Sequence, residues 1–142
     1  MDGHTASVDA GGATDARTAV NVLIEIATNT RANAYAPYSG YNVGAALLTA
    51  SGTVYSGCNV ENAAIGLTVC AERAAVVKAI SAGERDFDAI AVVTADGGTP
   101  CGACRQFLSE FGANITVIMA DQHGHYSMST VGKLLPHAFK LG

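Results

Sequence analysis

Residues 70–119 alternate between the sequence patterns of helices and buried strands, and they run CAERAAVVKAISAGERDFDAIAVVTADGGTPCGACRQFLSEFGANITVIM. We expect the first helix to begin at Cys70 and to end at Gly83, because apolar residues recur at helical spacing and glycine commonly ends a helix. A second helix is expected over 101–111, and buried strands are expected at 89–94 and 115–119. This alternation is typical of a sheet that is covered by helices.

The flanking segments add a helix, a hairpin and a few short elements. Apolar side chains recur at helical spacing over 15–33, with Thr14 as the expected N-cap. Two apolar runs on either side of the turn pair Ser51-Gly52 predict a hairpin. The expected elements are a helix at 15–33 ending in the turn 36–40, strands at 41–50 and 54–58, a loop at 59–69, a short strand at 126–129 and a helical turn at 131–135. We therefore expect an α/β fold, a three-layer α/β/α sandwich around a mixed sheet of about five strands.

The composition fits one folded domain. Of 142 residues, 49% are apolar and 14% are charged, whereas charged residues typically make up about 25% of a chain. Disorder requires fewer apolar residues and a larger net charge, and no apolar run approaches the length of a membrane span. We expect a single domain over 15–142, preceded by a flexible leader over 1–14 that is rich in Gly, Ala, Ser and Asp.

The charge balance and the cysteine content exclude some classes of function and indicate a compartment. A net charge of −4 with only eight basic residues argues against a protein that binds nucleic acids by neutralising phosphates. The leader lacks the basic start and the apolar stretch of a signal peptide, so we expect the four cysteines in a reducing compartment, the cytoplasm. In that compartment cysteines serve more often as metal ligands or catalytic groups than as disulfides.

Three cysteines and one glutamate form a candidate catalytic metal site. Cys101 and Cys104 lie three residues apart at the start of one predicted helix, and Cys70 lies at the start of another. Helix N-termini carry partial positive charge and favour the thiolates that bind zinc. Three protein ligands would leave the fourth position of one Zn²⁺ to water, and Glu72 would lie beside that water as a proton acceptor.

Simpler interpretations of these residues stay open at this point. A C-x-x-C pair alone is often a redox pair or half of a structural zinc site, and Cys58 could supply a fourth sulfur that closes the site. Within its predicted strand, however, Cys58 is more typical of a small buried apolar residue. Glu72 by itself fits the glutamates that favour the first turn of a helix. His123 and His125 lie in a polar loop, which is typical of exposed side chains rather than metal ligands.

The combination of CAE at 70–72 with PCGAC at 100–104 resembles the signature of zinc-dependent nucleobase deaminases, [HC]-x-E followed by P-C-x-x-C. Other segments are similar to the small, homotetrameric type of cytidine deaminase. They are APYS at 36–39, VGAALL at 43–48, GCNVENA at 57–63, CAER at 70–73 and PCGACRQ at 100–106. This resemblance covers about residues 31–139 and leaves only the leader and the first helix outside it.

The resemblance implies a reaction and a cofactor. The reaction is hydrolytic deamination of free cytidine and deoxycytidine to uridine and deoxyuridine in pyrimidine salvage, with release of ammonia. One zinc ion per subunit would be held by Cys70, Cys101 and Cys104, and Glu72 would carry protons from water to the base and to the departing amine. Arg73 would offset the excess negative charge by pairing with a ligand sulfur.

The resemblance also implies contacts with the substrate and between subunits. Gln106 would add a second donor to the ligand sulfurs. The residues expected to bind the nucleoside are Tyr41, Asn59, Glu61, Ala71 and Phe139, the last of which would reach the base in a neighbouring subunit. Tyr41 stands where the family usually has Phe, and Ile65 stands where many members have an aromatic residue at a subunit contact. A homotetramer would explain the few charges, because obligate interfaces are more apolar than free surface.

Other functions predict different observations. A deaminase for a cytosine-containing antibiotic would share the chemistry, although the NVEN stretch at 59–62 favours a plain nucleoside. A polynucleotide editor is disfavoured by the acidic balance and by the absence of basic or aromatic tracts. A non-catalytic module would bind a structural zinc ion with four sulfurs, from Cys58, Cys70, Cys101 and Cys104.

Overall fold

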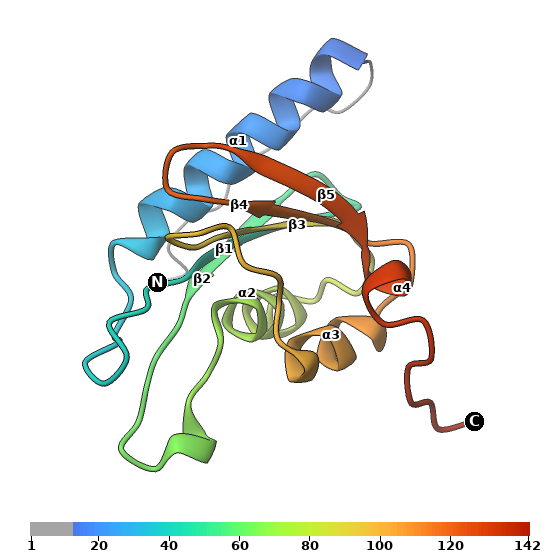
Figure 1. Cartoon of the computed structure of the whole chain (residues 1–142). Coiled ribbons are helices and arrows are strands. Elements are labelled where there is room, and N and C mark those ends of the chain that lie inside the picture. Colours follow the sequence, from blue (N-terminus) through green and yellow to red (C-terminus); the bar gives the residue numbers. More distant parts are fainter. Residues whose placement is uncertain (1–12) are drawn as a thin grey trace.

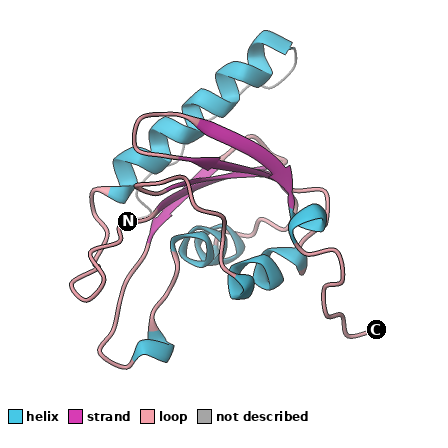
Figure 2. Cartoon of the chain, viewed as in Figure 1, coloured by secondary structure: helices cyan, strands magenta, loops and turns pink. Residues whose placement is uncertain are grey.

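A computed structural model describes residues 13–142 as a five-stranded sheet between helices (Figure 1). Along the chain the elements are α1 (Ala13–Arg31), β1 (Gly44–Thr49), β2 (Val54–Cys58), the 3₁₀ helix η1 (Ile65–Leu67), α2 (Ala71–Ser81), β3 (Phe87–Val93), α3 (Gly102–Ser109), β4 (Thr116–Ala120), β5 (Tyr126–Thr130) and α4 (Val131–Leu134). Figure 2 shows the three layers, with α1 on one face of the sheet and α2 and α3 on the other. The expected α/β/α sandwich is confirmed.

The order of the strands brings three chain segments to one end of the sheet. The order is β2-β1-β3-β4-β5, with β3 and β4 parallel and the other neighbours antiparallel. Gly44, the first residue of β1, pairs with both Cys58 and Val93, the last residues of β2 and β3. The chain before β1, the chain after β2 and the chain after β3 therefore leave the sheet together.

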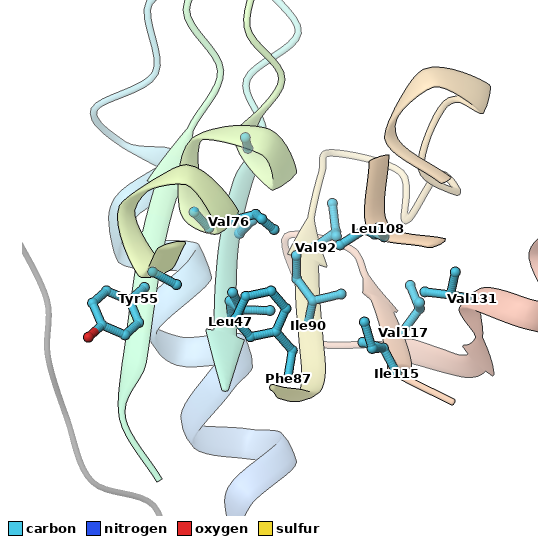
Figure 3. Packing of buried hydrophobic residues seen from close by; sticks show 14 of the residues in the cluster. Leu47, Tyr55, Val76, Phe87, Ile90, Val92, Leu108, Ile115, Val117 and Val131 are labelled. Carbon is cyan, nitrogen blue, oxygen red and sulfur yellow. The ribbon is translucent and has the colours of Figure 1, made fainter. Parts of the chain in front are cut away.

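Alternate residues of the strands build two cores, because successive side chains of a strand point to opposite faces. In β1, Leu47 packs with Val76 of α2 and Leu108 of α3 (Figure 3). Its neighbour Leu48 packs on the opposite face with Leu23 of α1. All of these side chains are nearly inaccessible to solvent, so both helix layers are anchored to the sheet by buried apolar area.

Two glycines let the helices approach the strands very closely. A Cβ atom on Gly44 would lie 2.0 Å from the Ala27 carbonyl oxygen of α1. A Cβ atom on Gly57 would lie 2.6 Å from the Ala75 nitrogen and 2.7 Å from the Ala71 carbonyl oxygen of α2. Backbone therefore packs directly on backbone, and the start of α2 is held against β2.

The structure differs from the sequence-based expectations at several boundaries. Thr14 lies inside α1 and is not its N-cap, so the last two residues of the expected leader are helical; residues 1–12 lie outside the described part of the chain. β1 begins at Gly44 rather than at 41, because a side chain from the segment after β2 bonds the backbone at 41–43. The expected loop at 59–69 contains η1.

Within 13–142, no helix has the length and apolar character needed to cross a membrane.

Candidate active site

The first turns of α2 and α3 bring three sulfur atoms together. Cys70 is the N-cap of α2 and Cys101 the N-cap of α3, and Cys104 lies in the first turns of α3. The two helices contact each other on one face of the sheet. As a result, the Sγ atoms of Cys70, Cys101 and Cys104 all lie within 4.8 Å of one another.

This sulfur cluster suits a zinc ion. Thiolates are preferred zinc ligands, and Zn–S bonds of about 2.3 Å in a tetrahedron place sulfur atoms roughly 3.8 Å apart, inside the observed limit. In the part of the chain that the structure describes, no other group of three or more His, Cys, Asp or Glu side chains lies close enough to hold an ion. Cys58 is outside the cluster, half-buried near the end of β2, where burial raises the pKa of its thiol.

The thiols of the cluster share a proton. The hydrogen bond from the Cys104 thiol lowers the pKa of Cys70 to about 5, with a further contribution from the Arg73 guanidinium. The same contact raises the pKa of Cys104, because loss of the shared proton would place two anions side by side. A metal cation can replace that proton, and metal binding to thiols releases protons in this way.

Arg73 lies against the sulfur cluster. Its Nη2 atom is 3.4 Å from the Cys70 Sγ and donates to the Thr68 carbonyl oxygen at 3.1 Å. Its Nε atom is buried and has no hydrogen-bond partner among the described residues. The guanidinium thus places a fixed positive charge beside the Cys70 sulfur.

Glu72 is a buried carboxyl in a cavity beside the sulfurs. Its side chain is 5% exposed, and burial raises the pKa of Glu72 to about 7. The negative charge of Cys70 acts in the same direction, while Arg73 opposes it. The cavity, ≈ 280 Å³, is lined by Glu72, Cys70, Cys101 and Ala71 together with residues of three loops. A carboxyl with this pKa can both accept and donate a proton near neutral pH.

The loops around the cavity hold the expected substrate residues. Tyr41, Asn59 and Glu61 all line it. The Asn59 side chain is itself bonded to backbone, since Nδ2 donates to the Tyr41 carbonyl oxygen at 2.8 Å and Oδ1 accepts from the Val43 nitrogen at 2.9 Å. Asn59 therefore supports the segment before β1 as well as facing the cavity.

Glu61 is held by the turn at 36–40. Its Oε1 atom accepts from the backbone nitrogens of Tyr38 at 2.9 Å and Ser39 at 3.1 Å, and its Oε2 atom accepts from the Ser39 hydroxyl. The Ser39 hydroxyl has the largest part in lowering the pKa of Glu61. Glu61 is therefore an ionised acceptor, and a second cavity of ≈ 730 Å³ lies against it and shares Cys70 and Thr68 with the first.

Gln106 and Phe139 lie apart from the cavity. The Gln106 side chain accepts from the Phe139 nitrogen at 3.1 Å and donates to the Phe139 carbonyl oxygen at 3.0 Å. The Gln106 amide is thus bonded to the C-terminal segment, and its contact with a ligand sulfur stays a prediction. Phe139 is exposed and does not line the cavity of its own chain.

Sequence reasoning missed two groups that shape the site. Asp96 accepts from the Tyr41 hydroxyl at 2.8 Å, and a signal for it existed, since a carboxylate followed by two glycines comes directly after a buried strand. Arg105 donates to the carbonyl oxygens of Pro100 at 2.8 Å and Leu134 at 2.9 Å, so it ties the segment before Cys101 to α4. His123 and His125 are exposed beside Asp121, as expected.

Comparison with known proteins agrees with the site. Residues 18–120 match the family described as "Cytidine and deoxycytidylate deaminase zinc-binding region". A cytidine deaminase of Sporosarcina psychrophila is 49% identical over 84% of this chain and 90% of its own length, and one of Halalkalibacterium halodurans is 50% identical over 83% and 92%. The crystal structure of cytidine deaminase from Burkholderia pseudomallei has a TM-score of 0.81 at 49% identity, covering 84% of this chain and 98% of that one. The chain belongs to the cytidine and deoxycytidylate deaminase family.

Proposed function

We propose that the protein hydrolyses free cytidine and deoxycytidine to uridine and deoxyuridine and releases ammonia, as a step of pyrimidine salvage. The observation that carries this proposal is the buried Glu72, which lines a cavity beside a three-sulfur cluster. A purely structural zinc site has no use for such a carboxyl. Catalysis of hydrolysis does, because a proton must leave the attacking water and reach the leaving group.

Cys70, Cys101 and Cys104 would hold one zinc ion per subunit. When bound, zinc supplies a Lewis acid that makes water a nucleophile near neutral pH. Arg73 keeps its guanidinium against the Cys70 sulfur and offsets the excess negative charge that three thiolates bring to a dication. The three sulfurs leave room for one further ligand, as catalytic zinc sites require.

Glu72 would carry the protons of the reaction. Its carboxylate accepts a proton from the attacking water while a bond forms from that oxygen to C4 of the cytosine ring. Glu72 delivers this proton to ring nitrogen N3. It then takes the second proton of the same oxygen, which becomes the C4 carbonyl, and delivers it to the amino group, so that the C4–N bond breaks and ammonia leaves. Water and cytidine thus give uridine and ammonia, with the carboxyl returned to its starting state.

The nucleoside would be bound by the loops around the cavity. Ala71, which is fully buried, and Tyr41 both line the cavity. The amide of Asn59 keeps one N–H and one lone pair beyond its two backbone bonds, and the Glu61 carboxylate can accept from a sugar hydroxyl. These are the groups we assign to the base and the sugar.

The charges around the cavity favour a nucleoside over a nucleotide. Among the described residues that line the two cavities, Arg73 is the one cation, and it faces the Cys70 sulfur. Glu61 and Glu72 add negative charge. A phosphate would therefore meet repulsion without a basic partner, which argues against deoxycytidylate and against polynucleotides.

We also propose that four copies assemble and that Phe139 reaches the base in a neighbouring subunit. Support comes from exposed apolar side chains beside the larger cavity, of which Ile65 is 85% and Leu67 68% exposed, and from Phe139 at 69%. Patches of this kind mark interfaces. Size-exclusion chromatography with light scattering tests the assembly, and a monomer in solution would contradict it.

Free thiols at the site also favour the reducing cytoplasm as the compartment of this protein.

The decisive experiment compares wild type with Glu72→Ala. Cytidine turnover is followed by absorbance, and zinc content is measured in both proteins. We expect full zinc in both and almost no turnover in the variant, because removal of the carboxyl removes the proton carrier and leaves the sulfurs in place. Comparable turnover by Glu72→Ala would contradict the mechanism.

Two further measurements separate the alternatives. A panel of cytidine, deoxycytidine, deoxycytidylate, a cytosine-containing antibiotic and a single-stranded oligonucleotide identifies the substrate, and we expect turnover of the first two. X-ray absorption at the zinc edge distinguishes three sulfurs plus a light atom from four sulfurs. Four sulfurs would support a structural zinc module that includes Cys58. We expect three, because Cys58 lies outside the cluster.

A further inference from the structure

One side-chain hydrogen bond joins two loops that border the active-site cavity. Tyr41 lies before β1, Asp96 lies between β3 and α3, and the Tyr41 hydroxyl donates to Asp96 Oδ1 at 2.8 Å across 55 positions of sequence. The two loops meet because Gly44 pairs with Val93, so both segments leave the sheet at the same end. The second loop leads directly to Cys101.

Hydrogen bonds within its own loop hold the Asp96 carboxylate in place as an acceptor. Its Oδ1 atom also accepts from the Thr94 hydroxyl at 3.2 Å and from the Gly98 nitrogen at 3.3 Å. The bond from Tyr41, followed by that from Thr94, holds the pKa of Asp96 below its usual value. The carboxylate is therefore ionised at neutral pH, and hydrogen bonds to ionised acceptors are stronger than neutral ones.

Tyr41 is held at its backbone as well. Its nitrogen donates to the Ser39 hydroxyl at 2.9 Å, and its carbonyl oxygen accepts from Asn59 Nδ2 at 2.8 Å. The remaining freedom of Tyr41 is rotation of its side chain, which the bond to Asp96 restricts. The fit is close, since a Cβ atom on Gly98 would lie only 3.1 Å from the Tyr41 hydroxyl oxygen.

We propose that Tyr41 and Asp96 form a positioning pair that orients the Tyr41 ring toward the base of the bound nucleoside. This inference rests on the proposed function, because it assumes that the cavity binds a nucleoside. Asp96 does not line the cavity and acts through Tyr41, which does. A ring that contacts the base equally before and during the reaction contributes uniform binding, so its loss raises KM and leaves kcat unchanged.

The test is steady-state kinetics with cytidine on wild type, Tyr41→Phe, Asp96→Ala, the double variant and Asp96→Asn. We expect KM to rise about fivefold in each of Tyr41→Phe and Asp96→Ala, the value of one ordinary hydrogen bond, with kcat unchanged. The KM of the double variant should equal that of either single variant, because each single substitution already removes the same bond. Asp96→Asn keeps a neutral oxygen acceptor, which makes a weaker bond, so its KM should lie between those of wild type and Asp96→Ala.

Matched controls are Tyr126→Phe on β5 and Asp88→Ala on β3, both exposed and outside the lining of the cavity. Zinc content and thermal unfolding are measured for every variant, and if Asp96→Ala fails to fold, Tyr41→Phe and Asp96→Asn decide. A wild-type KM in Tyr41→Phe, or effects that multiply in the double variant, would overturn the pair. A fall in kcat at constant KM would also overturn it. Absence of turnover by wild type contradicts the proposed function instead.

Discussion

Asn59, just after β2, donates from its side-chain amide to the carbonyl oxygen of Tyr41 at 2.8 Å. The same amide accepts from the Val43 nitrogen at 2.9 Å, so it replaces strand pairing for a segment that leaves the sheet. Asn59 is 7% exposed, and its loss would leave partly buried backbone groups without partners. The residue that we assign to the nucleoside thus also holds the wall of the cavity in place.

Asn59→Ala should therefore lower the free energy of unfolding by about 1–3 kcal/mol and raise KM for cytidine, because buried backbone groups lose their bonds. Urea unfolding and steady-state kinetics measure the two effects. Asn62→Ala is the matched control, since the Asn62 side chain is exposed and, among residues 13–142, accepts only from the nearby Ala64 nitrogen. Equal unfolding free energies for the two variants would contradict this role of Asn59.

Arg73→Gln should weaken zinc retention by about 10- to 100-fold, the usual effect of removing a group that supports a metal ligand. The physical reason is the loss of a positive charge 3.4 Å from the Cys70 sulfur. Competition with a chromophoric chelator measures the affinity. Arg85→Gln serves as the control, because the Arg85 guanidinium is bonded to the carbonyl oxygens of Ile80 and Glu84, away from the sulfurs. Unchanged zinc retention in Arg73→Gln would show that Arg73 does not support the metal site.

The raised pKa of Glu72 predicts a pH dependence of stability in the metal-free protein. Its pKa is about 7 in the folded chain against an ordinary value of 4.5, so folding favours the protonated form. The contribution to stability is complete below about pH 4.5 and is lost as pH rises through about 7, by roughly 3 kcal/mol in total. Glu72→Gln cannot ionise and should lack this loss.

Urea unfolding of metal-free wild type and Glu72→Gln at about pH 5 and about pH 8 measures the difference. Thiol titration is common to both proteins and largely cancels in the comparison. We expect the variant to gain stability relative to wild type at the higher pH. A difference that is independent of pH would show that Glu72 ionises normally in the folded chain.

Gly57→Ala should destabilise the fold by about 3 kcal/mol, because overpacking against backbone forces elements apart. The added methyl group would meet the α2 backbone at 2.6 Å, near the turn that carries Cys70 and Glu72. Zinc retention should fall with stability. Gly66→Ala is the control, since nothing lies within 4 Å of its Cβ position. Thermal unfolding and zinc content test both variants, and similar stability in the two would contradict close packing at Gly57.

Local patterns predicted most of the architecture. The apolar runs that we expected at 54–58 and 89–94 form β2 and most of β3, and the helix expected from Cys70 to Gly83 is α2 with Cys70 as its N-cap. Such patterns report which face of a segment is buried, and burial does not depend on the identity of the partner. Boundaries were less well predicted, as β1 shows, because side-chain bonds from elsewhere in the chain decided where strand pairing stops.

The sequence by itself determined the elements, the three sulfurs and the carboxyl beside them, because Cys70 and Glu72 share one helix start and Cys101 and Cys104 share another. Only the tertiary structure decided which polar atoms satisfy one another. In the folded chain the Gln106 amide bonds the Phe139 backbone, 33 positions away. The Tyr41 hydroxyl bonds Asp96, 55 positions away. Partners so distant in sequence meet only when sheet order and register bring their loops to the same end, and hydrogen bonds form over a few ångströms alone.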